Sequence, residues 1–158
     1  MSTEVFLGLG SNLGQPETNI HSAIAMLQDA VTDLSVGGWY RSKPLGPSAQ
    51  PDYVNTVVRA RTNLDPDALL DLCQSIEAAH NRVRSERWGP RTLDIDILYF
   101  GQSRIESPRL TIPHPEILNR SFVVFPLLDL IPTAITPTGD HLDRRRYDPN
   151  SLTSITPT

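Results

Sequence analysis

The sequence is poor in cysteine, lysine and aromatic residues, and each shortage excludes a class of protein. The single cysteine, Cys73, rules out an internal disulfide framework and a metal site built from several cysteines. We interpret it as a core residue of a protein from a reducing compartment. Aromatic residues make up 6% of the chain, and acidic residues outnumber basic ones by 18 to 14. A protein that holds a long nucleic acid needs an extended positive surface, so this composition does not favour that function.

Long apolar runs are also missing. A membrane-spanning helix needs about 20 predominantly apolar residues in succession. The most apolar stretch, residues 122–131, falls short of this and is interrupted by Pro126 and Asp129. The first six residues lack the basic stretch and apolar run of a signal peptide. We therefore expect a soluble, cytoplasmic protein with no membrane partner.

The 158 residues, of which 39% are hydrophobic, suffice for one domain with its own core. We expect a single domain over residues 1–158, in which residues 133–158, rich in Thr and Pro, form a loosely packed C-terminal tail. The positive charge comes from 13 arginines and one lysine. Guanidinium groups suit the forked recognition of phosphate, although a compositional bias would give the same count.

Hydrophobic patterning predicts the order strand, helix, strand, strand, helix, strand. We expect the four strands at residues 5–9, 34–40, 53–61 and 93–100, and the two helices after Pro16 and after Pro66. A short strand at 104–106 and a helix at 120–130 follow. Two strand-helix-strand halves joined by a loop are typical of the split βαβ pattern. We therefore predict a ferredoxin-like α+β sandwich, an antiparallel sheet with helices packed on one face.

Two segments are expected to be irregular. Residues 41–52 contain three prolines and a glycine, which neither a helix nor a central strand tolerates, so we predict a long functional loop there. Gly8, Gly10 and Gly14 follow the first strand, but their spacing does not fit the dinucleotide-binding fingerprint, and no Walker lysine follows. We interpret these glycines as a tight turn that brings the backbone close to a ligand.

The sharpest local pattern is the alternation Leu93-Asp94-Ile95-Asp96-Ile97. In a strand, a period of two places Asp94 and Asp96 on one face and the three aliphatic residues on the other. Adjacent carboxylates repel each other unless a cation lies between them, and they suit Mg²⁺ carried on the phosphates of a nucleotide. The alternative is a solvated acidic face with no ligand.

Basic residues flank this pair along the chain. Four arginines precede it: Arg82, Arg84, Arg87 and Arg91. Three further donors follow it: Arg109, His114 and Arg120. Carboxylates that hold Mg²⁺ on a polyphosphate, with guanidinium groups near the remaining oxygens, are what phosphoryl transfer requires. A charged surface loop and a structural histidine are the alternatives.

Aromatic and amide side chains suggest a second ligand. Tyr53 and Asn55 share one face of their predicted strand beside the proline-rich loop, and Phe122 lies in a later apolar segment. Aromatic rings together with an amide suit a flat heterocycle. Taken alone, Tyr53 and Phe122 also fit the core.

Four motifs in this order resemble the 6-hydroxymethyl-7,8-dihydropterin pyrophosphokinase family. They are Gly8-Leu9-Gly10-Ser11-Asn12-Leu13-Gly14, Pro44-Leu45-Gly46-Pro47 with Gln50-Pro51-Asp52-Tyr53-Val54-Asn55, Arg87-Trp88-Gly89-Pro90-Arg91-Thr92-Leu93-Asp94-Ile95-Asp96, and Leu110-Thr111-Ile112-Pro113-His114. The resemblance spans nearly the whole chain. It implies transfer of the βγ-diphosphate of ATP to the hydroxymethyl group of the pterin, with two Mg²⁺ ions and release of AMP, in folate biosynthesis.

The resemblance also implies roles for individual residues. It makes Asp94 and Asp96 the metal ligands, with Arg82, Arg91 and Asp96 in catalysis. Positions at the pterin are Ser42, Leu45, Tyr53, Asn55, Asp94 and Phe122. Positions at ATP are Gln74, Arg84, Arg87, Arg109, Thr111, His114 and Arg120.

Three departures from the family pattern lie near these residues. The arginine loop before Trp88 is one residue shorter, Pro115 stands where a tyrosine often follows the histidine, and Lys43 replaces a common proline. A non-catalytic pterin or nucleotide binding module remains an alternative, and a ferredoxin-like RNA-binding domain is a weaker one. We expect a monomer that binds ATP and a dihydropterin but no nucleic acid, although the sequence itself does not fix the oligomeric state.

Overall fold

A computed structural model describes residues 2–43, 51–80 and 92–157. Its helices are α1 (Pro16–Gln28), α2 (Pro66–Ala79), α3 (Ser121–Leu130) and the single-turn η1 (Ile117–Asn119) and η2 (Arg144–Arg146). Its strands are β1 (Thr3–Ser11), β2 (Thr32–Val36), β3 (Trp39–Ser42), β4 (Tyr53–Thr62), β5 (Asp94–Phe100), β6 (Ile105–Glu106), β7 (Thr111–Ile112) and β8 (Leu152–Ile155). None of the helices in these ranges is long and apolar enough to cross a membrane.

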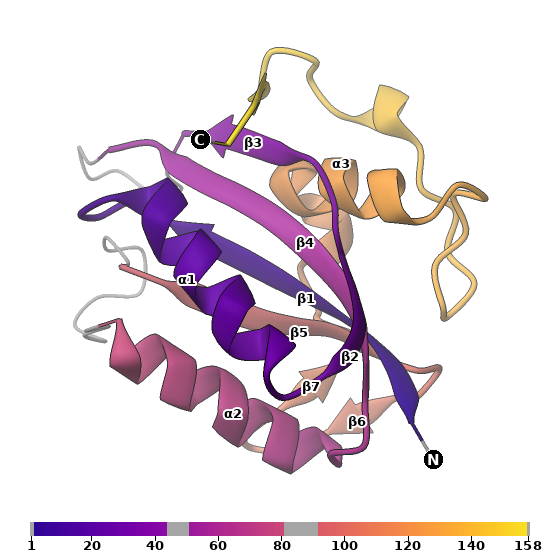
Figure 1. The fold of residues 1–158 in the computed structure, drawn as a ribbon. Coiled ribbons are helices and arrows are strands. Elements are labelled where there is room, and N and C mark those ends of the chain that lie inside the picture. Colours follow the sequence, from indigo (N-terminus) through magenta and orange to yellow (C-terminus); the bar gives the residue numbers. More distant parts are fainter. Residues whose placement is uncertain (1, 44–50, 81–91, 158) are drawn as a thin grey trace.

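The main sheet is antiparallel and has the order β5-β1-β4-β3-β8, with β2 also paired to β4 (Figure 1). The two units β1-α1-β2/β3 and β4-α2-β5 interleave, because β4 lies between β1 and the β2/β3 edge. This arrangement confirms the predicted ferredoxin-like α+β fold.

The helices of these two units begin and pack as the sequence predicts. In α2, the Asp65 side chain caps the N-terminus by accepting a hydrogen bond from the Ala68 amide (2.8 Å), and Pro66 occupies the first turn. In α1, Pro16 has the same place. Each helix buries one apolar stripe against the sheet: Ile20, Ala23, Ile24 and Leu27 from α1, and Leu69, Cys73 and Ile76 from α2.

The third helix covers the opposite face of the sheet. Figure 1 shows α1 and α2 together on one side of the strands and α3, in orange, on the other. The expectation of helices on one face therefore holds for α1 and α2 but not for α3. Residues on several sides of α3 are buried, among them Val124, Phe125 and Leu127, and such a helix needs a cover on more than one side. The sheet supplies one cover and the C-terminal segment supplies part of the other.

The predicted strand at 34–40 is divided into β2 and β3 at Gly37 and Gly38. The physical reason is the close approach of α3. A Cβ atom on Gly37 would lie 2.5 Å from the Pro126 carbonyl oxygen, and one on Gly38 would lie 2.5 Å from Asp129 Oδ2. The helix therefore contacts bare backbone at this point, which only glycine allows.

The C-terminal segment packs more closely than we predicted. Its strand β8 pairs with β3, with Ser42 opposite Leu152, and extends the sheet (Figure 1). Leu142 is buried, and its amide donates a hydrogen bond to the Ala134 carbonyl (2.7 Å). The Thr and Pro content of residues 133–158 conceals this order, because a four-residue strand and isolated apolar anchors leave little periodic signal.

Candidate functional site

The α3 face of the sheet changes from apolar to polar along three adjacent strands. On β1 this face passes from Phe6 to Gly8 and Gly10, on β4 from Val57 to Asn55 and Tyr53, and on β5 from Leu98 to Asp96 and Asp94. The register places Asp94, Gly10, Asn55 and Tyr40 in one row across the sheet. The polar ends of the strands therefore meet beside α3.

The glycines of β1 make room for this polar region. Gly8 and Gly10 lie inside the strand, opposite Asp96 and Asp94, so interpreting them as a tight turn was wrong. Of the three, Gly14 has the left-handed backbone of a turn, with φ of 70°. A Cβ atom on Gly10 would lie 3.0 Å from Asn55 Oδ1 and 3.7 Å from Tyr53 Cδ1. A missing side chain at position 10 thus leaves space for both residues.

Asp94 and Asp96 share the α3 face, as the alternation predicts, because Ile95 and Ile97 are buried on the other side. The Asp96 side chain is 35% exposed, and its Oδ2 lies 3.7 Å from Arg120 Nη1. Between the two acids, the Ile95 amide donates a hydrogen bond to Oε2 of the buried Glu77 (2.9 Å). The edge strand that carries both carboxylates is thereby fixed to α2.

His114 reaches the same region from the segment after β7. Its amide donates to the Leu98 carbonyl (3.1 Å), and its ring Nδ1 accepts a hydrogen bond from the Glu116 amide (3.1 Å). Burial and the positive charge of Arg120 lower the pKa of His114, against the opposing effect of Glu116 and Asp94. The ring is therefore neutral at pH 7, and with Nδ1 as acceptor it carries its proton on Nε2.

The predicted pterin residues approach from the opposite side of this region. Asn55 is 5% exposed, and its Nδ2 donates a hydrogen bond to Ser42 Oγ (2.8 Å) on the neighbouring strand β3. Phe122 lies in the first turn of α3, and the Arg120 guanidinium carbon lies 5.7 Å from the centre of its ring. Arg120 therefore connects the aromatic side of the site with Asp96.

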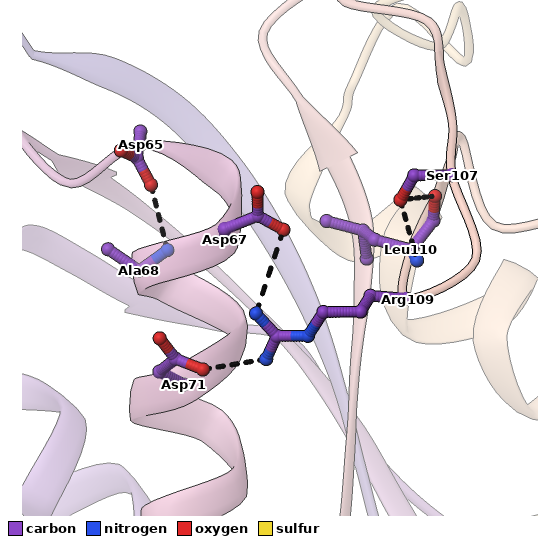
Figure 2. A network of polar contacts seen from close by, with 7 residues as sticks. All are labelled: Asp65, Asp67, Ala68, Asp71, Ser107, Arg109 and Leu110. Carbon is purple, nitrogen blue, oxygen red and sulfur yellow. Dashed lines mark hydrogen bonds and ion pairs between the residues drawn. The ribbon is translucent and has the colours of Figure 1, made fainter.

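The predicted nucleotide residues Gln74, Arg109 and Thr111 lie on α2 and on the segment that includes β6 and β7. Figure 2 shows Arg109 reaching toward α2, where its Nη2 lies 2.6 Å from Asp71 Oδ1 and its Nη1 lies 3.9 Å from Asp67 Oδ1. Gln74 is exposed on α2 one turn after Asp71. Arg109 and α2 are thus brought together, a contact that the sequence did not predict.

Several predicted residues lie outside the described ranges. They are Leu45, Arg82, Arg84, Arg87 and Arg91. The two departures from the family pattern that do fall within these ranges, Lys43 and Pro115, are exposed.

The sequence interpretation missed a group of hydrogen-bonded polar residues, of which Ser11 and Asn12 are buried. Ser11 Oγ donates a hydrogen bond to the Thr92 carbonyl, and Asn19 Nδ2 donates to the same carbonyl (3.2 Å). Asn12 Nδ2 donates to the Pro51 carbonyl (2.9 Å). Thr92 lies two residues before the strand of the acids, and Pro51 lies two residues before the strand of Tyr53. The only sequence signal was the cluster of Ser and Asn at the end of a glycine-containing strand.

The donor set at Asp94 and Asp96 fits Mg²⁺ bound to a polyphosphate. Among the described residues no group of three or more His, Cys, Asp or Glu side chains could hold a metal ion alone. Mg²⁺ characteristically keeps several waters and takes one or two carboxylates plus phosphate oxygens. A carboxylate pair next to a guanidinium therefore suits a cation that a nucleotide carries. Among the described residues it does not supply enough ligands for a metal centre made of protein groups alone.

Fold and site together define a ferredoxin-like α+β protein whose carboxylate pair, arginine and neutral histidine suit a metal-bound polyphosphate. Residues 6–132 match the model of the 7,8-dihydro-6-hydroxymethylpterin-pyrophosphokinase (HPPK) family, so the chain belongs to that family. The resemblance stated from its motifs is thereby confirmed.

Curated relatives agree with this assignment. The chain is 45% identical to a 2-amino-4-hydroxy-6-hydroxymethyldihydropteridine pyrophosphokinase of Pseudomonas aeruginosa, over 90% of this chain and 89% of the relative. It is 47% identical to one from Haemophilus influenzae, over 85% of each.

Two solved HPPK-DHPS chains share the fold. A triple mutant from Plasmodium falciparum gives a TM-score of 0.68 at 14% identity, covering 90% of this chain and 42% of that one. An HPPK-DHPS in complex with substrates gives 0.69 at 14% identity, covering 93% and 43%. The chain therefore spans less than half the length of these two proteins.

Proposed function

We propose that the protein transfers the βγ-diphosphate of ATP to the hydroxymethyl group of 6-hydroxymethyl-7,8-dihydropterin, giving AMP and the pterin diphosphate in folate biosynthesis. The observation that carries this proposal is the carboxylate pair Asp94 and Asp96 at the polar end of the α3 face, with Arg120 Nη1 3.7 Å from Asp96. Membership of the HPPK family supports it independently.

Asp94 and Asp96 are the residues that would hold two Mg²⁺ ions. When bound, these ions neutralise charge on the triphosphate and orient the attacking and leaving oxygens. The carboxylates are suited to this because their strand is fixed on both sides. Gly8 and Gly10 pair with them on β1, and Glu77 holds the amide between them. Little general-base chemistry is then required of the protein, since phosphoryl transfer depends chiefly on positioning and charge stabilisation.

Arg120 and His114 would bind phosphate oxygens beside the acids. Arg120 supplies a permanent positive charge, and the neutral His114 can donate one hydrogen bond from Nε2. We assign Arg82 and Arg91 to catalysis and Arg84 and Arg87 to ATP from their positions in the family motif alone.

Tyr53, Asn55 and Phe122 would bind the pterin, with Ser42 and Leu45 beside them. Because Asn55 Nδ2 is engaged by Ser42, its Oδ1 is the atom presented as an acceptor to the edge of a heterocycle. Tyr53 and Phe122 would stack on the faces of the ring. Gln74, Arg109 and Thr111 would contact the nucleoside, and the ion pair from Arg109 to Asp71 holds Arg109 against α2, the helix that carries Gln74.

We further propose that the enzyme is a cytoplasmic monomer. Its one cysteine, Cys73, is buried and unpaired, as in proteins of reducing compartments. Sedimentation velocity of the purified protein tests the monomer, and fractionation of cells that produce it tests the compartment.

The decisive experiment incubates the purified protein with ATP, Mg²⁺ and 6-hydroxymethyl-7,8-dihydropterin and then separates the nucleotides. We expect AMP to accumulate only when the pterin is present. ADP instead of AMP would mean that the γ-phosphorus is attacked, and the proposed reaction would be wrong. Pterin binding without any nucleotide product would point to the binding module. Omitting Mg²⁺ tests the metal, since the expected reaction then stops.

A further inference from the structure

The C-terminal segment from Leu142 to Ile155 lies beyond the residues that define the family, which end at position 132. It nevertheless contacts two elements that border the candidate site, α3 and β3. One part packs along α3, and the other part is the strand β8 at the edge of the sheet.

Two side-chain hydrogen bonds fix the chain between η1 and the start of α3. Tyr147 Oη donates a hydrogen bond to the Leu118 carbonyl (2.6 Å), two residues before Arg120. Ser151 Oγ lies 3.0 Å from Ser121 Oγ, the residue between Arg120 and Phe122. The segment is therefore hydrogen-bonded on either side of the arginine that faces Asp96.

A second anchor joins the segment to the far end of α3. Arg144 Nη2 lies 3.8 Å from Asp129 Oδ1, and its guanidinium carbon lies 4.4 Å from the centre of the Phe125 ring. Asp129 Oδ2 also accepts hydrogen bonds from Tyr40 Oη (2.8 Å) and the Gly38 amide (3.0 Å). The segment, α3 and the beginning of β3 thus form one connected polar network.

Strand β8 also holds β3, the second element that borders the site. Strand β3 has four residues and pairs with β4 on one side and with β8 on the other. Leu152 lies opposite Ser42, and Ser42 accepts the hydrogen bond from Asn55. Without β8, β3 would be a short edge strand with Ser42 at its end, and a short unpaired edge frays readily.

We propose that the segment from Leu142 to Ile155 is a positioning element of the pterin side of the site. It holds Ser42, and through it Asn55, in place from the sheet edge, and it holds Phe122 through the start of α3. The residues assigned to the nucleoside, Gln74, Arg109 and Thr111, lie on α2 and on the segment from β6 to β7, which make none of the contacts described above. The inference rests on the proposed function and adds that pterin recognition extends beyond the family-defining residues.

The test compares two variants with a matched control. One variant ends at Asn150 and lacks β8, and the second is full-length Leu152→Ala, which keeps the strand but removes the side chain opposite Ser42. The control is Arg145→Ala in the same segment, whose side chain is 90% exposed and pairs with Asp143. KM for the dihydropterin and KM for ATP are measured separately, and thermal unfolding verifies the fold of each variant.

We expect the shortened chain to raise KM for the dihydropterin about tenfold, the effect of about 1.4 kcal/mol of lost binding free energy. Leu152→Ala should raise it about threefold and leave KM for ATP within about twofold of the unaltered protein, as Arg145→Ala should do for both values. The shortened chain also loses the Ser151 contact beside Arg120, so its KM for ATP should rise, but less than its KM for the dihydropterin. Loss of stability alone would lower the active fraction and leave both KM values unchanged. Equal increases in both KM values, or an unchanged KM for the pterin in both variants, would overturn the inference.

Calorimetric binding of the dihydropterin with α,β-methylene-ATP separates this inference from the proposed function. An unaltered protein that forms AMP, but whose variants bind the pterin equally well, contradicts the inference alone. An unaltered protein that forms no AMP contradicts the proposed function. Even then, if the shortened chain binds the pterin more weakly than the full-length protein does, the positioning role is supported.

Discussion

The two faces of the sheet are built from the same strands but differ in what fills them. On the face of α1 and α2, β1 contributes Val5, Leu7 and Leu9, and the buried Ser11 follows at the end of the strand. On the α3 face the same strand contributes Phe6 and then two glycines. One face is thus packed throughout, and the other is packed for half its length and polar for the rest.

This difference shows how the protein supports a polar site without weakening its core. Because side chains alternate along a strand, Ile95 and Ile97 anchor β5 in the packed face while Asp94 and Asp96 project from the other. Full burial of one such aliphatic side chain contributes about 1.5–3 kcal/mol. The packed face therefore holds the backbone of the site, and the polar face is left to bind ligands.

The largest effect should come from the polar face. Asp96→Ala is expected to lower turnover by about 10³-fold or more, as the loss of a group that stabilises transition-state charge does. The urea midpoint should stay close to that of the unaltered protein, because Asp96 lies outside the apolar clusters. Glu106→Ala, at an exposed acid on β6, is the control. Near-normal turnover in the Asp96 variant would refute its role as a metal ligand.

A substitution in the core should lower stability and change turnover little. Leu7→Ala removes a fully buried side chain from the packed face and is expected to lower the free energy of unfolding by about 2–5 kcal/mol. Turnover per folded molecule should change little, since Leu7 faces away from the acids. Urea unfolding measures the loss, with the exposed Leu13→Ala as control. A large fall in turnover with normal stability would show that the two faces are not separable in this way.

The glycines of β1 allow a finer test of the polar face. Gly10→Ala places a Cβ atom 3.0 Å from Asn55 Oδ1, whereas the nearest atoms to a Cβ atom on Gly8 are in Leu98 at 3.5 Å, an ordinary contact. Because a weakened hydrogen bond to a buried group costs about 1–3 kcal/mol, a displaced Asn55 should raise KM for the pterin about tenfold. Gly8→Ala should change it less. Equal effects of the two variants on KM would argue against a role for Asn55.

The smallest effect concerns the ionisation of Cys73 on the packed face. Burial raises the pKa of this thiol from 9.0 to about 12, with Glu77 and Asp96 adding to the shift. An unfolded thiol loses its proton near pH 9 and the folded one does not, so the folded state loses stability as pH rises through this window. The urea midpoint should therefore fall more steeply above pH 9 in the unaltered protein than in Cys73→Ala. Parallel pH profiles would contradict the raised pKa.

Local patterns predicted the parts of the molecule that local physics determines. The alternation around Asp94 and Asp96, the capping of α2 by Asp65 and the apolar stripe of α1 each depend on residues within a few positions. The shared face of Asn55 and Tyr53 followed in the same way. These features placed Asp94 and Asp96, and likewise Tyr53 and Asn55, on one shared face of their strands, as the structure shows.

Long-range contacts determined what the sequence could not predict. The break at Gly37 and Gly38 exists because α3 lies against it, although Pro126 and Asp129 are about ninety positions away in the chain, a separation no periodic pattern registers. The sequence suggested a turn at Gly8 and Gly10, because the side chains that pack beside these glycines belong to other strands and are distant in the sequence. The pairing of Arg109 with Asp71 and of β8 with β3 likewise depends on tertiary structure.

The order of strands also implies a gradient of motion across the site. Strand β4 is paired on both sides, with β1 on one and with β2 and β3 on the other, so its amides should exchange with solvent among the slowest in the sheet. Strand β5 is paired with β1 along one side, and the Glu77 carboxylate holds its outward Ile95 amide on the other. Tyr53 and Asn55 thus belong to a strand that is paired on both sides, as β1 also is. The two acids belong to a boundary strand whose outer side is held by the Glu77 carboxylate and by the His114 amide, so its amides should exchange faster than those of β4.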